Sequence, residues 1–418
     1  MNRMTSPEDL DPLLNPLDAV LADIAVNVQL PPGLHEKADG RYKSVRTYAE
    51  REGSPLNGKV LHFYPQGSMA IDATISTRGT DDEYDLDIIA QVVDEGADPD
   101  VVLDELAAAL DGYPTSKSVE RQTRCVTVRY ADGMHLDVTP AVRLPYGDER
   151  ESHIFHANPE KPSEHRRVPM NAFGFAKWYQ TRTPLERRFA TAMNRRLYEA
   201  YGYEIRAEAE VDEGPDQVPL IVKNTATVAL QLLKRFRNVA YANAPGRIPP
   251  SVMMSCFAGH AAAANTSLSA MVIRQARMIA QALRAASARR EKVRVVNPVH
   301  TDDVFTDRWP ENLAQQDEFA RKLTELADGL EYLQSHDVSL EDLQEWLRER
   351  FGSHVVSRSI RQLNERLGRS VRNAAQSYTR KGGVYVPSAP KIIGAAAPSL
   401  LAAPAVAKPH TFMGGRRP

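Results

Sequence analysis

The sequence predicts an α+β protein in which a mixed sheet-and-helix unit is followed by a largely helical domain. Between about residues 58 and 145, four short apolar or alternating segments have the pattern of strands, with one helical segment among them. From residue 171 onward, apolar residues recur at the three-to-four-residue spacing of amphipathic helices. A length of 418 residues leaves room for two or three domains, each with a core of its own.

Composition limits the class of protein. Charged residues at 25% and hydrophobic residues at 42% are ordinary globular values. A net charge of -2 disfavours a protein that coats duplex DNA, but a small anion such as a nucleotide needs only a local positive site. The two cysteines, Cys125 and Cys256, support neither a disulfide framework nor a zinc site. Without a signal-peptide pattern or an apolar run of membrane-spanning length, we expect a soluble, cytoplasmic protein with no membrane contact.

The expected elements divide the chain into four parts. They are N-terminal helices that pack on both lobes (1–57), a core (58–169), a helical substrate-binding domain (170–382) and a flexible tail (383–418). Within the core we expect strands over 59–68, 85–93, 125–130 and 134–142, a helix over 98–112, and a polar loop from about 144 to 169.

Acidic residues and a Gly-Ser pair stand at the ends of these strands. Asp85 and Asp87 open an apolar run, and their side chains point the same way because strand side chains alternate. Like charges on one face repel each other, so we expect a cation between them. Gly67 and Ser68 end the preceding strand, where backbone N–H groups and a hydroxyl can hold anionic oxygens. Asp137 adds a third acid on a later strand.

Each feature alone has an ordinary explanation, a turn or a solvated strand face, but together they favour one chemistry. Magnesium prefers hard oxygen ligands and is held by one or two carboxylates plus substrate phosphates. A third acid allows a two-metal site to activate an attacking hydroxyl. We therefore expect Asp85, Asp87 and Asp137 to form a catalytic, metal-binding site for nucleotidyl transfer, with two Mg²⁺ ions, or Mn²⁺ in their place.

The same residues carry a family resemblance. Gly67-Ser68, Asp85-Leu86-Asp87 and Asp137 resemble the signature of DNA-polymerase-β-type nucleotidyltransferases. The wording "YPQGSM…T…DEYDLDII" resembles the bacterial CD-NTases, cyclic-oligonucleotide synthases related to animal cyclic GMP-AMP synthase. The similarity runs from about residue 10 to 385 through "NAFGFAKWY", "LQLLKRFRN", "IPPSVMMSC" and "VVNPVHTDDVFTDRW".

Two departures from the family pattern stand out. Ala172 stands where proline is usual. There is also no cysteine-rich zinc ribbon of the kind the animal DNA sensor uses, so DNA-triggered activation is not expected.

The resemblance implies a bilobal fold, with a polymerase-β-like nucleotidyltransferase core, a mostly helical second domain and an active-site cleft between them. It assigns the donor triphosphate to Gln66, Gly67, Ser68 and neighbouring amides. It also assigns the β- and γ-phosphates to Lys234, with Arg235 and Arg237 as secondary candidates.

The resemblance also implies roles for Ser251 and for Asp302 or Asp303, and two of the candidates have competing explanations in the sequence alone. The basic cluster at 234–237 has the pattern of a solvated helix face. Ser251, a candidate contact of the donor nucleotide, also fits an ordinary helix cap. Asp302 or Asp303 is a candidate contact of the acceptor nucleotide, and we favour Asp303.

The implied function is a second-messenger synthase that joins nucleoside triphosphates, ATP and/or GTP, into a cyclic di- or trinucleotide with release of pyrophosphate, in anti-phage defence signalling. One alternative is an RNA-tailing or polymerising nucleotidyltransferase, which would need a basic acceptor groove. Another is a non-catalytic nucleotide sensor or scaffold, which the presence of all three acids disfavours. The tail, with Gly414-Gly415, is a candidate for ubiquitin-like conjugation machinery or an effector protein, the alternative being a plain disordered end.

Overall fold

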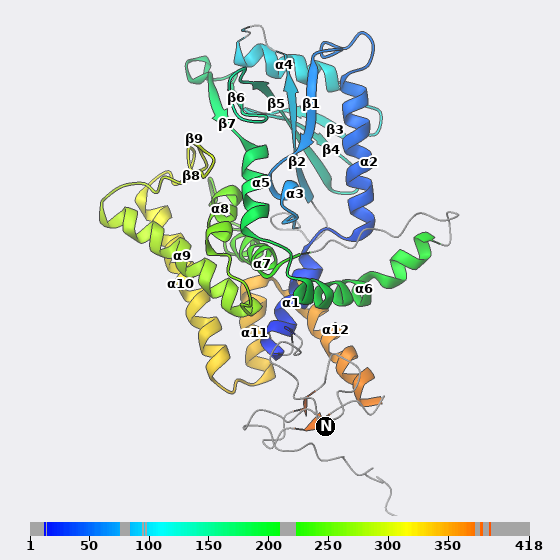
Figure 1. Ribbon diagram of the computed structural model, residues 1–418, viewed down its shortest axis with the longest axis vertical. Coiled ribbons are helices and arrows are strands. Elements are labelled where there is room, and N and C mark those ends of the chain that lie inside the picture. The colour runs from blue at the N-terminus through cyan, green and yellow to red at the C-terminus, as the bar shows by residue number, and fades with distance from the viewer. Residues whose placement is uncertain are drawn as a thin grey trace, which may run out of the picture.

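A computed structural model describes residues 12–13, 15–75, 84–93, 96, 98–209, 223–372, 377–378 and 384–385. It has a sheet lobe stacked on a helical lobe (Figure 1). The predicted α+β arrangement is therefore confirmed. None of the described helices combines the length and the apolarity needed to cross a membrane. Gly414-Gly415 lies outside the described residues.

The sheet lobe is built on a seven-stranded sheet with the order β1-β2-β5-β4-β3, extended from β5 by β6 and β7. β2 and β5 run parallel and every other pair is antiparallel. Helix α4 lies in the long connection that a parallel pair requires. The bounds are β1 Val60–Pro65, β2 Tyr84–Val92, α4 Pro99–Leu110, β3 Ser118–Arg121, β4 Val126–Arg129, β5 Met134–Arg143, β6 Ser152–His156 and β7 Arg166–Met170.

Strands β2 and β5 form the centre of this sheet because their apolar residues are buried on both faces. Leu86 and Ile88 belong to the core shared with α2 and α4, while Ile89 belongs to a smaller cluster on the opposite face. Pro140 is tolerated in β5 because it lies where the antiparallel neighbour changes from β4 to β6, so no ladder N–H is required there.

The region from 144 to 169 is not a simple loop, so that prediction was wrong. It contains β6, β7 and the 3-10 turn η2 (Pro162–Glu164). Its polar residues hid the strands because some of them are buried with partners: Ser152 is fully buried and accepts a hydrogen bond from Gln91 Nε2 at 2.7 Å. Two other elements also lacked a sequence signal, namely β3 and the hairpin of β8 (Val296–Asn297) and β9 (His300–Val304).

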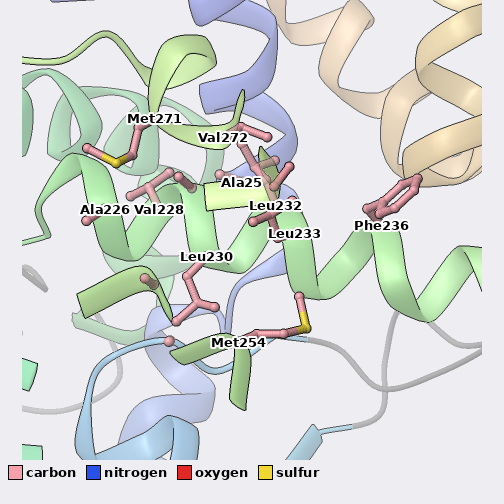
Figure 2. Close-up of a cluster of buried hydrophobic side chains, with 14 of the residues drawn as sticks. Ala25, Ala226, Val228, Leu230, Leu232, Leu233, Phe236, Met254, Met271 and Val272 are labelled. Carbon is pink, nitrogen blue, oxygen red and sulfur yellow. The ribbon is translucent and has the colours of Figure 1, made fainter. Parts of the chain in front are cut away.

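The helical lobe is organised around α7, which is buried on almost every side. Figure 2 shows Leu230, Leu232 and Leu233 of α7 in one apolar cluster with Ala25 of α1, Met254 of α8 and Met271 of α9. The bounds of the helices are α1 Pro16–Val28, α5 Ala172–Arg182, α6 Arg187–Ala209, α7 Thr225–Ala240, α8 Ser251–Ala261, α9 Leu268–Ala288, α10 Leu313–Ser335, α11 Leu340–Phe351 and α12 Ser353–Arg372. Two short strands follow, β10 Ser377–Tyr378 and β11 Val384–Tyr385.

The N-terminal helices divide between the lobes. Helix α1 is part of the helical core, whereas α2 (Pro32–Ala49) buries Ala38, Val45 and Ala49 in the core of the sheet lobe. Helix α5 begins at Ala172, and the Asn171 side chain caps it by accepting from Gly174 N at 2.7 Å. The unusual alanine at this first helical position is tolerated because the cap does not depend on it.

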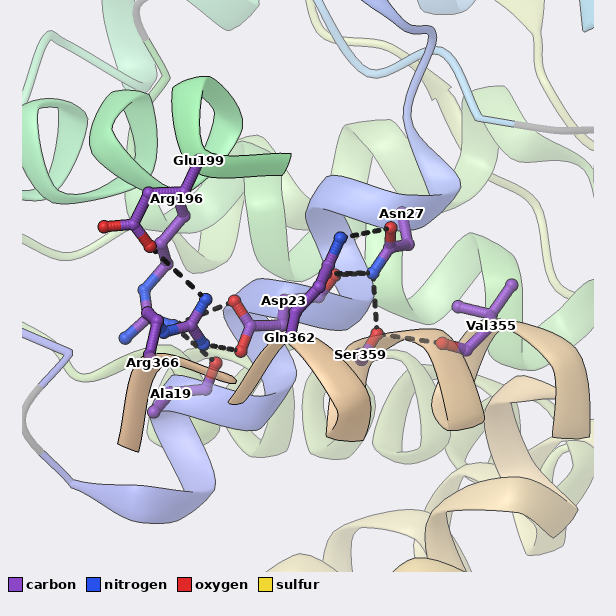
Figure 3. A network of polar contacts seen from close by, with 9 residues as sticks. All are labelled: Ala19, Asp23, Asn27, Arg196, Glu199, Val355, Ser359, Gln362 and Arg366. Atoms are coloured by element: carbon purple, nitrogen blue, oxygen red, sulfur yellow. Dashed lines mark hydrogen bonds and ion pairs between the residues drawn. The ribbon is translucent and has the colours of Figure 1, made fainter. Parts of the chain in front are cut away.

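A buried polar network fixes α12 against α1 and α6 (Figure 3). Asp23 is 1% exposed and accepts from Arg196 Nη1 at 2.8 Å and from Arg366. Arg366 also lies 3.6 Å from Glu199, and Asn27 donates to Ser359 Oγ at 2.9 Å. One carboxylate thus links three helices that are far apart in the sequence.

We predict that Asp23→Ala lowers the free energy of unfolding by about 3 kcal/mol, because it leaves two guanidinium groups without their shared buried carboxylate. Urea denaturation measures the change. Asp39→Ala is the control, since it removes the exposed i,i+4 pair with Lys43 and should lower the stability far less. Equal losses in the two variants would show that the network contributes no more than a surface ion pair.

Candidate functional site

The acidic residues named from the sequence meet on the central strands of the sheet. In the parallel pairing of β2 with β5, Asp87 lies directly beside Asp137, and Asp85 lies beside His135. Their neighbours Leu86 and Leu136 are buried in the core, so the acids point away from it, as the alternation of strand side chains requires. The structure therefore brings all three acids to one place.

The carboxylates of Asp137 and Asp85 each have a fixed hydrogen-bond partner. Asp137 Oδ1 accepts a hydrogen bond from Thr127 Oγ1 at 2.6 Å. Asp85 Oδ1 lies 2.9 Å from His135 Nδ1, and His135 Nε2 lies 3.1 Å from Arg129 Nη1. Because a guanidinium group can only donate, Nε2 accepts from it and Nδ1–H donates to Asp85. His135 thus holds Asp85 in one orientation.

Sequence reasoning did not identify Thr127 or assign a role to His135. A hairpin interpretation of residues 126–138, turning at Asp132-Gly133, would have aligned Thr127 with Asp137 and Arg129 with His135, as the structure does. The alternation of side chains along residues 126–138 therefore contained the information that pairs Thr127 with Asp137.

Electrostatic repulsion is built into this group of acids. Burial, followed by the charges of Asp137 and Asp85, raises the pKa of Asp87 to about 7. Burial also raises the pKa of Asp137. A bound cation would relieve both effects.

The donor set suits magnesium in its chemistry, because carboxylate oxygens are the ligands this ion prefers. Across the described ranges, no three or more His, Cys, Asp or Glu side chains converge closely enough to hold a metal ion by themselves. A magnesium site here would take its remaining ligands from substrate phosphates, which is the usual arrangement for this ion.

The Gly-Ser pair lies against the acids. Gln66 N donates to Asp87 O at 2.8 Å, and Gly67 and Ser68 begin the single-turn helix α3 (Gly67–Ala70). Gly67 has φ +57°, and a Cβ there would lie 2.5 Å from Asp87 Oδ2. Only glycine allows this close approach of backbone and carboxylate.

Residues 71–75, which we call the strap, follow α3 and pack against the core of the helical lobe. Ala73 N donates to Ser68 O at 2.9 Å, and Ala73 O accepts from Lys234 Nζ at 2.7 Å. Thr74 O accepts from Gln231 Nε2 at 3.0 Å. The strap is thus hydrogen-bonded to α3 on one side and to α7 on the other.

The structure contradicts the alternative explanation of the basic residues of α7 as a solvated helix face. Lys234 and Arg235 are buried, and Arg235 donates to Phe351 O at 2.8 Å. Burial, with Arg237 next in importance, lowers the pKa of Lys234 to about 7. The charge of Asp87 acts in the opposite direction on this pKa, and the hydrogen bond to Ala73 O places Lys234 at the strap that follows Ser68.

The two remaining candidates are held by protein partners. Ser251 does not cap α8, because Pro250 is the N-cap residue; its hydroxyl instead accepts from Arg237 Nη1 at 2.7 Å. Asp303 is buried, and its Oδ2 accepts from Asn171 N at 3.1 Å and from Asn297 Nδ2 at 2.9 Å. In this state Asp303 joins β8 and β9 to the start of α5.

Comparison with known proteins identifies the family. Residues 17–159 match the domain described as Second Messenger Oligonucleotide or Dinucleotide Synthetase. This match, the two-lobed fold and the extensive identity described next show that the chain belongs to the CD-NTase family of nucleotidyltransferases.

One relative is similar over almost its whole length. The chain is 57% identical over 408 residues to the cyclic dinucleotide synthase CdnG of Bradyrhizobium diazoefficiens. The aligned residues cover 97% of each protein. The structure of that CD-NTase in complex with GTP matches with a TM-score of 0.76 and 54% identity, covering 84% of this chain and 100% of that one. E. coli CdnC with ATP, at 13% identity and a TM-score of 0.53 over 80% of this chain and 97% of that one, shares the fold.

We predict that Asp87→Asn stabilises the metal-free protein at pH 8, by on the order of 1 kcal/mol. Because the pKa of Asp87 is about 7 in the folded protein and 3.8 in the unfolded chain, ionising this carboxyl destabilises the folded state. This destabilisation is absent below about pH 4 and fully present above about pH 7. The gain should therefore be small at pH 5 and should grow with pH. Urea denaturation in EDTA at both pH values measures it.

The exposed carboxylate of Asp302 provides the control for this measurement, because Asp302→Asn removes a negative charge from β9, which is not part of the sheet that holds the acids. A stability difference for Asp87→Asn that does not grow from pH 5 to pH 8 would show that the acids do not repel each other in the folded protein.

Proposed function

We propose that this protein is a cyclic dinucleotide synthase that joins purine nucleoside triphosphates, GTP among them, between its two lobes. The observation that carries the proposal is the placement of Asp85, Asp87 and Asp137 on adjacent strands, with Gly67-Ser68 against them. The 57% identity to a cyclic dinucleotide synthase and the match to a relative solved with GTP support the choice of product and substrate.

The proposed reaction consists of two successive nucleotidyl transfers. A ribose hydroxyl of one nucleotide attacks the α-phosphorus of the other, its proton passes to the Asp137 carboxylate, and the α–β anhydride bond breaks to release pyrophosphate. The linear product then re-binds, and the same exchange between its remaining hydroxyl and its own α-phosphorus closes the ring and releases a second pyrophosphate.

The chain's own residues have separate tasks in this scheme. Ser68 and the amides around Gly67 bind the donor phosphates, and Lys234 beneath the strap adds positive charge on the same side. His135 keeps Asp85 in one orientation, and Thr127 does the same for Asp137. Magnesium held by the carboxylates together with the substrate phosphates would neutralise charge on the attacking and leaving oxygens.

Two parts of the proposal rest on the family resemblance and go beyond the geometry. One is a role in anti-phage signalling. The other is conjugation of the C-terminal tail by ubiquitin-like machinery, or its contact with an effector protein. Product analysis of the isolated chain tests neither of them, so they stand apart from the enzymatic proposal.

The function predicts a phosphatase-resistant cyclic dinucleotide when the protein is incubated with all four nucleoside triphosphates and Mg²⁺. Mass spectrometry after phosphatase treatment identifies the product and its bases. Asp137→Asn should lower the yield at least about 1,000-fold, because it removes both a metal ligand and the proton acceptor. Extension of an added RNA 3′ end in place of a cyclic product would support the tailing alternative, and no turnover would support a sensor.

We predict that Gly67→Ala lowers the rate of cyclic dinucleotide synthesis about 100-fold or more, because the new Cβ displaces the Asp87 carboxylate. Gly112→Ala is a matched control: Gly112 also has a positive φ, of +67°, but its Cβ would meet only the Tyr48 hydroxyl at 3.6 Å. Both variants should lose about 1 kcal/mol of stability to backbone strain. Similar activity in the two variants would contradict a role for the Gly67–Asp87 contact.

A further inference from the structure

A line of polar side chains crosses the sheet at the level of Asp85. Strands β2, β5, β4 and β3 lie side by side in that order (Figure 1). Asp85 of β2 lies beside His135 of β5. His135 lies in turn beside Arg129 of β4, and Arg129 lies beside Ser118 of β3. Because directly opposite residues on neighbouring strands share a face of the sheet, these side chains are all on the face that carries the acids.

Hydrogen bonds join these side chains into one continuous network. His135 Nδ1 lies 2.9 Å from Asp85 Oδ1, and Arg129 Nη1 lies 3.1 Å from His135 Nε2. The same guanidinium donates through Nε to Glu120 Oε1 at 2.9 Å, and Ser118 Oγ donates to that oxygen at 3.0 Å. Contacts thus run from Asp85 to β3, the last strand in the order of the sheet. We call Ser118, Glu120, Arg129 and His135 the polar row.

Asp85 depends on this support more than the other two acids do. Its side chain is 60% exposed, and its Oδ2 forms no hydrogen bond within the described part of the chain. The other two acids are held by Thr127 or lie against Gly67. An exposed carboxylate keeps several rotamers unless a neighbour holds it. The contact with His135 therefore fixes the side chain of Asp85, and Arg129 in turn fixes the ring of His135.

Stability of the fold does not account for the far end of the polar row. The side chains of Arg129 and Glu120 are 38% and 42% exposed, and ion pairs that reach solvent add little to stability because water screens them. What the pair does fix is geometry, since one planar guanidinium donates to the carboxylate through Nε and to the imidazole through Nη1. An ammonium group on a flexible stem cannot hold both partners in this way.

The charge of Arg129 provides a way to test what the residue does. Its hydrogen bond to Glu120 raises the pKa of Arg129, and the charges of Asp137 and Asp85 act in the same direction. A cation that interacts with these acids also repels a metal ion, so charge alone would make Arg129 weaken metal binding. Positioning of Asp85 would instead make Arg129 strengthen metal binding. The two effects have opposite signs, so a single substitution distinguishes them.

We propose that Arg129 and Glu120 are positioning residues, which act through His135 to hold Asp85 in the orientation that binds the metal ion. This inference rests on the proposed function, because it takes Asp85 to be a metal ligand. Removal of a hydrogen-bond partner behind a metal ligand typically lowers metal affinity or activity about 10- to 100-fold.

Three variants separate positioning from charge. Arg129→Gln removes both the cation and the bridge between His135 and Glu120. Arg129→Lys keeps the charge but loses the planar group that makes the bridge. Glu120→Gln keeps the shape of the side chain at the far end of the polar row but loses its charge-assisted hydrogen bond to Arg129.

Arg121→Gln is the charge-matched control. Arg121 follows Glu120 on β3 but pairs with Val126, so its side chain lies on the opposite face of the sheet. There it donates to Asp104 of α4 and to Ala157 O. The control therefore removes the same charge from the same hairpin without breaking a contact of the polar row.

The experiment measures the binding of Mn²⁺ by electron paramagnetic resonance. Each protein is titrated with Mn²⁺ in the presence of guanosine 5′-(α,β-methylene)triphosphate, which supplies phosphates but does not react because its α–β bridge does not cleave. A titration without protein gives the Mn²⁺ that the nucleotide holds by itself. The remaining Mn²⁺ is bound at the protein and yields an apparent Kd for each variant.

Wild-type protein and Arg121→Gln should have the same Kd within about twofold. Arg129→Gln and Arg129→Lys should raise the Kd about tenfold or more, and Glu120→Gln should raise it about threefold or more. Tighter binding in Arg129→Gln would show that the residue acts through its charge and would overturn the proposal. A wild-type Kd in Arg129→Lys would do the same, because positioning needs the planar group.

Catalysis provides a second readout that a general structural defect would not reproduce. In Arg129→Lys, the Mg²⁺ concentration for half-maximal synthesis should rise about tenfold, a larger change than the fall in kcat at saturating Mg²⁺. A variant with a damaged fold would instead lose kcat with an unchanged Mg²⁺ requirement, and that result would contradict a positioning role.

Failure of the proposed function gives a different result. Wild-type protein that binds Mn²⁺ but makes no cyclic dinucleotide would overturn the function, and the order of the Mn²⁺ affinities would still decide the role of the polar row. Wild-type protein that binds no Mn²⁺ beyond what the nucleotide holds would overturn the inference itself, because Asp85 would then hold no metal ion.

Discussion

The hydrogen bond between the buried ammonium group of Lys234 and the carbonyl of Ala73 is the contact on which the site depends. It ties the strap to α7, and the strap in turn holds α3 through Ser68. Because α7 is buried on nearly every side, it cannot shift without disturbing the helical core. The position of the candidate phosphate-binding turn is therefore set by the packing of the other lobe.

The acids of the site work against the stability of the fold. Asp87 and Asp137 lie side by side on the two central strands, where apolar residues would be more stable. Their raised pKa values are the measure of that conflict. The surrounding sheet tolerates it because Leu86, Ile88 and Leu136 are fully buried on the other side. A residue pattern that is unfavourable for folding alone is the expected sign of a binding site for a cation.

Long-range polar links compensate by fixing the parts that meet around the site. Asp23 joins α1, α6 and α12, and Asp303 joins β9 to the start of α5. Each of these buried charges has its partners, so the links stabilise the architecture around the site.

The sequence by itself determined the α+β class, most helices, the central strands and the three acids, because period and local spacing carry that information. It did not determine β6 and β7, whose polar residues resemble a loop until Gln91 is seen to bond Ser152. It also left open whether the basic residues of α7 form a solvated face. Only tertiary structure decided that Lys234 is buried beneath the strap, because its partner is a backbone carbonyl about 160 residues away, which no local pattern reveals.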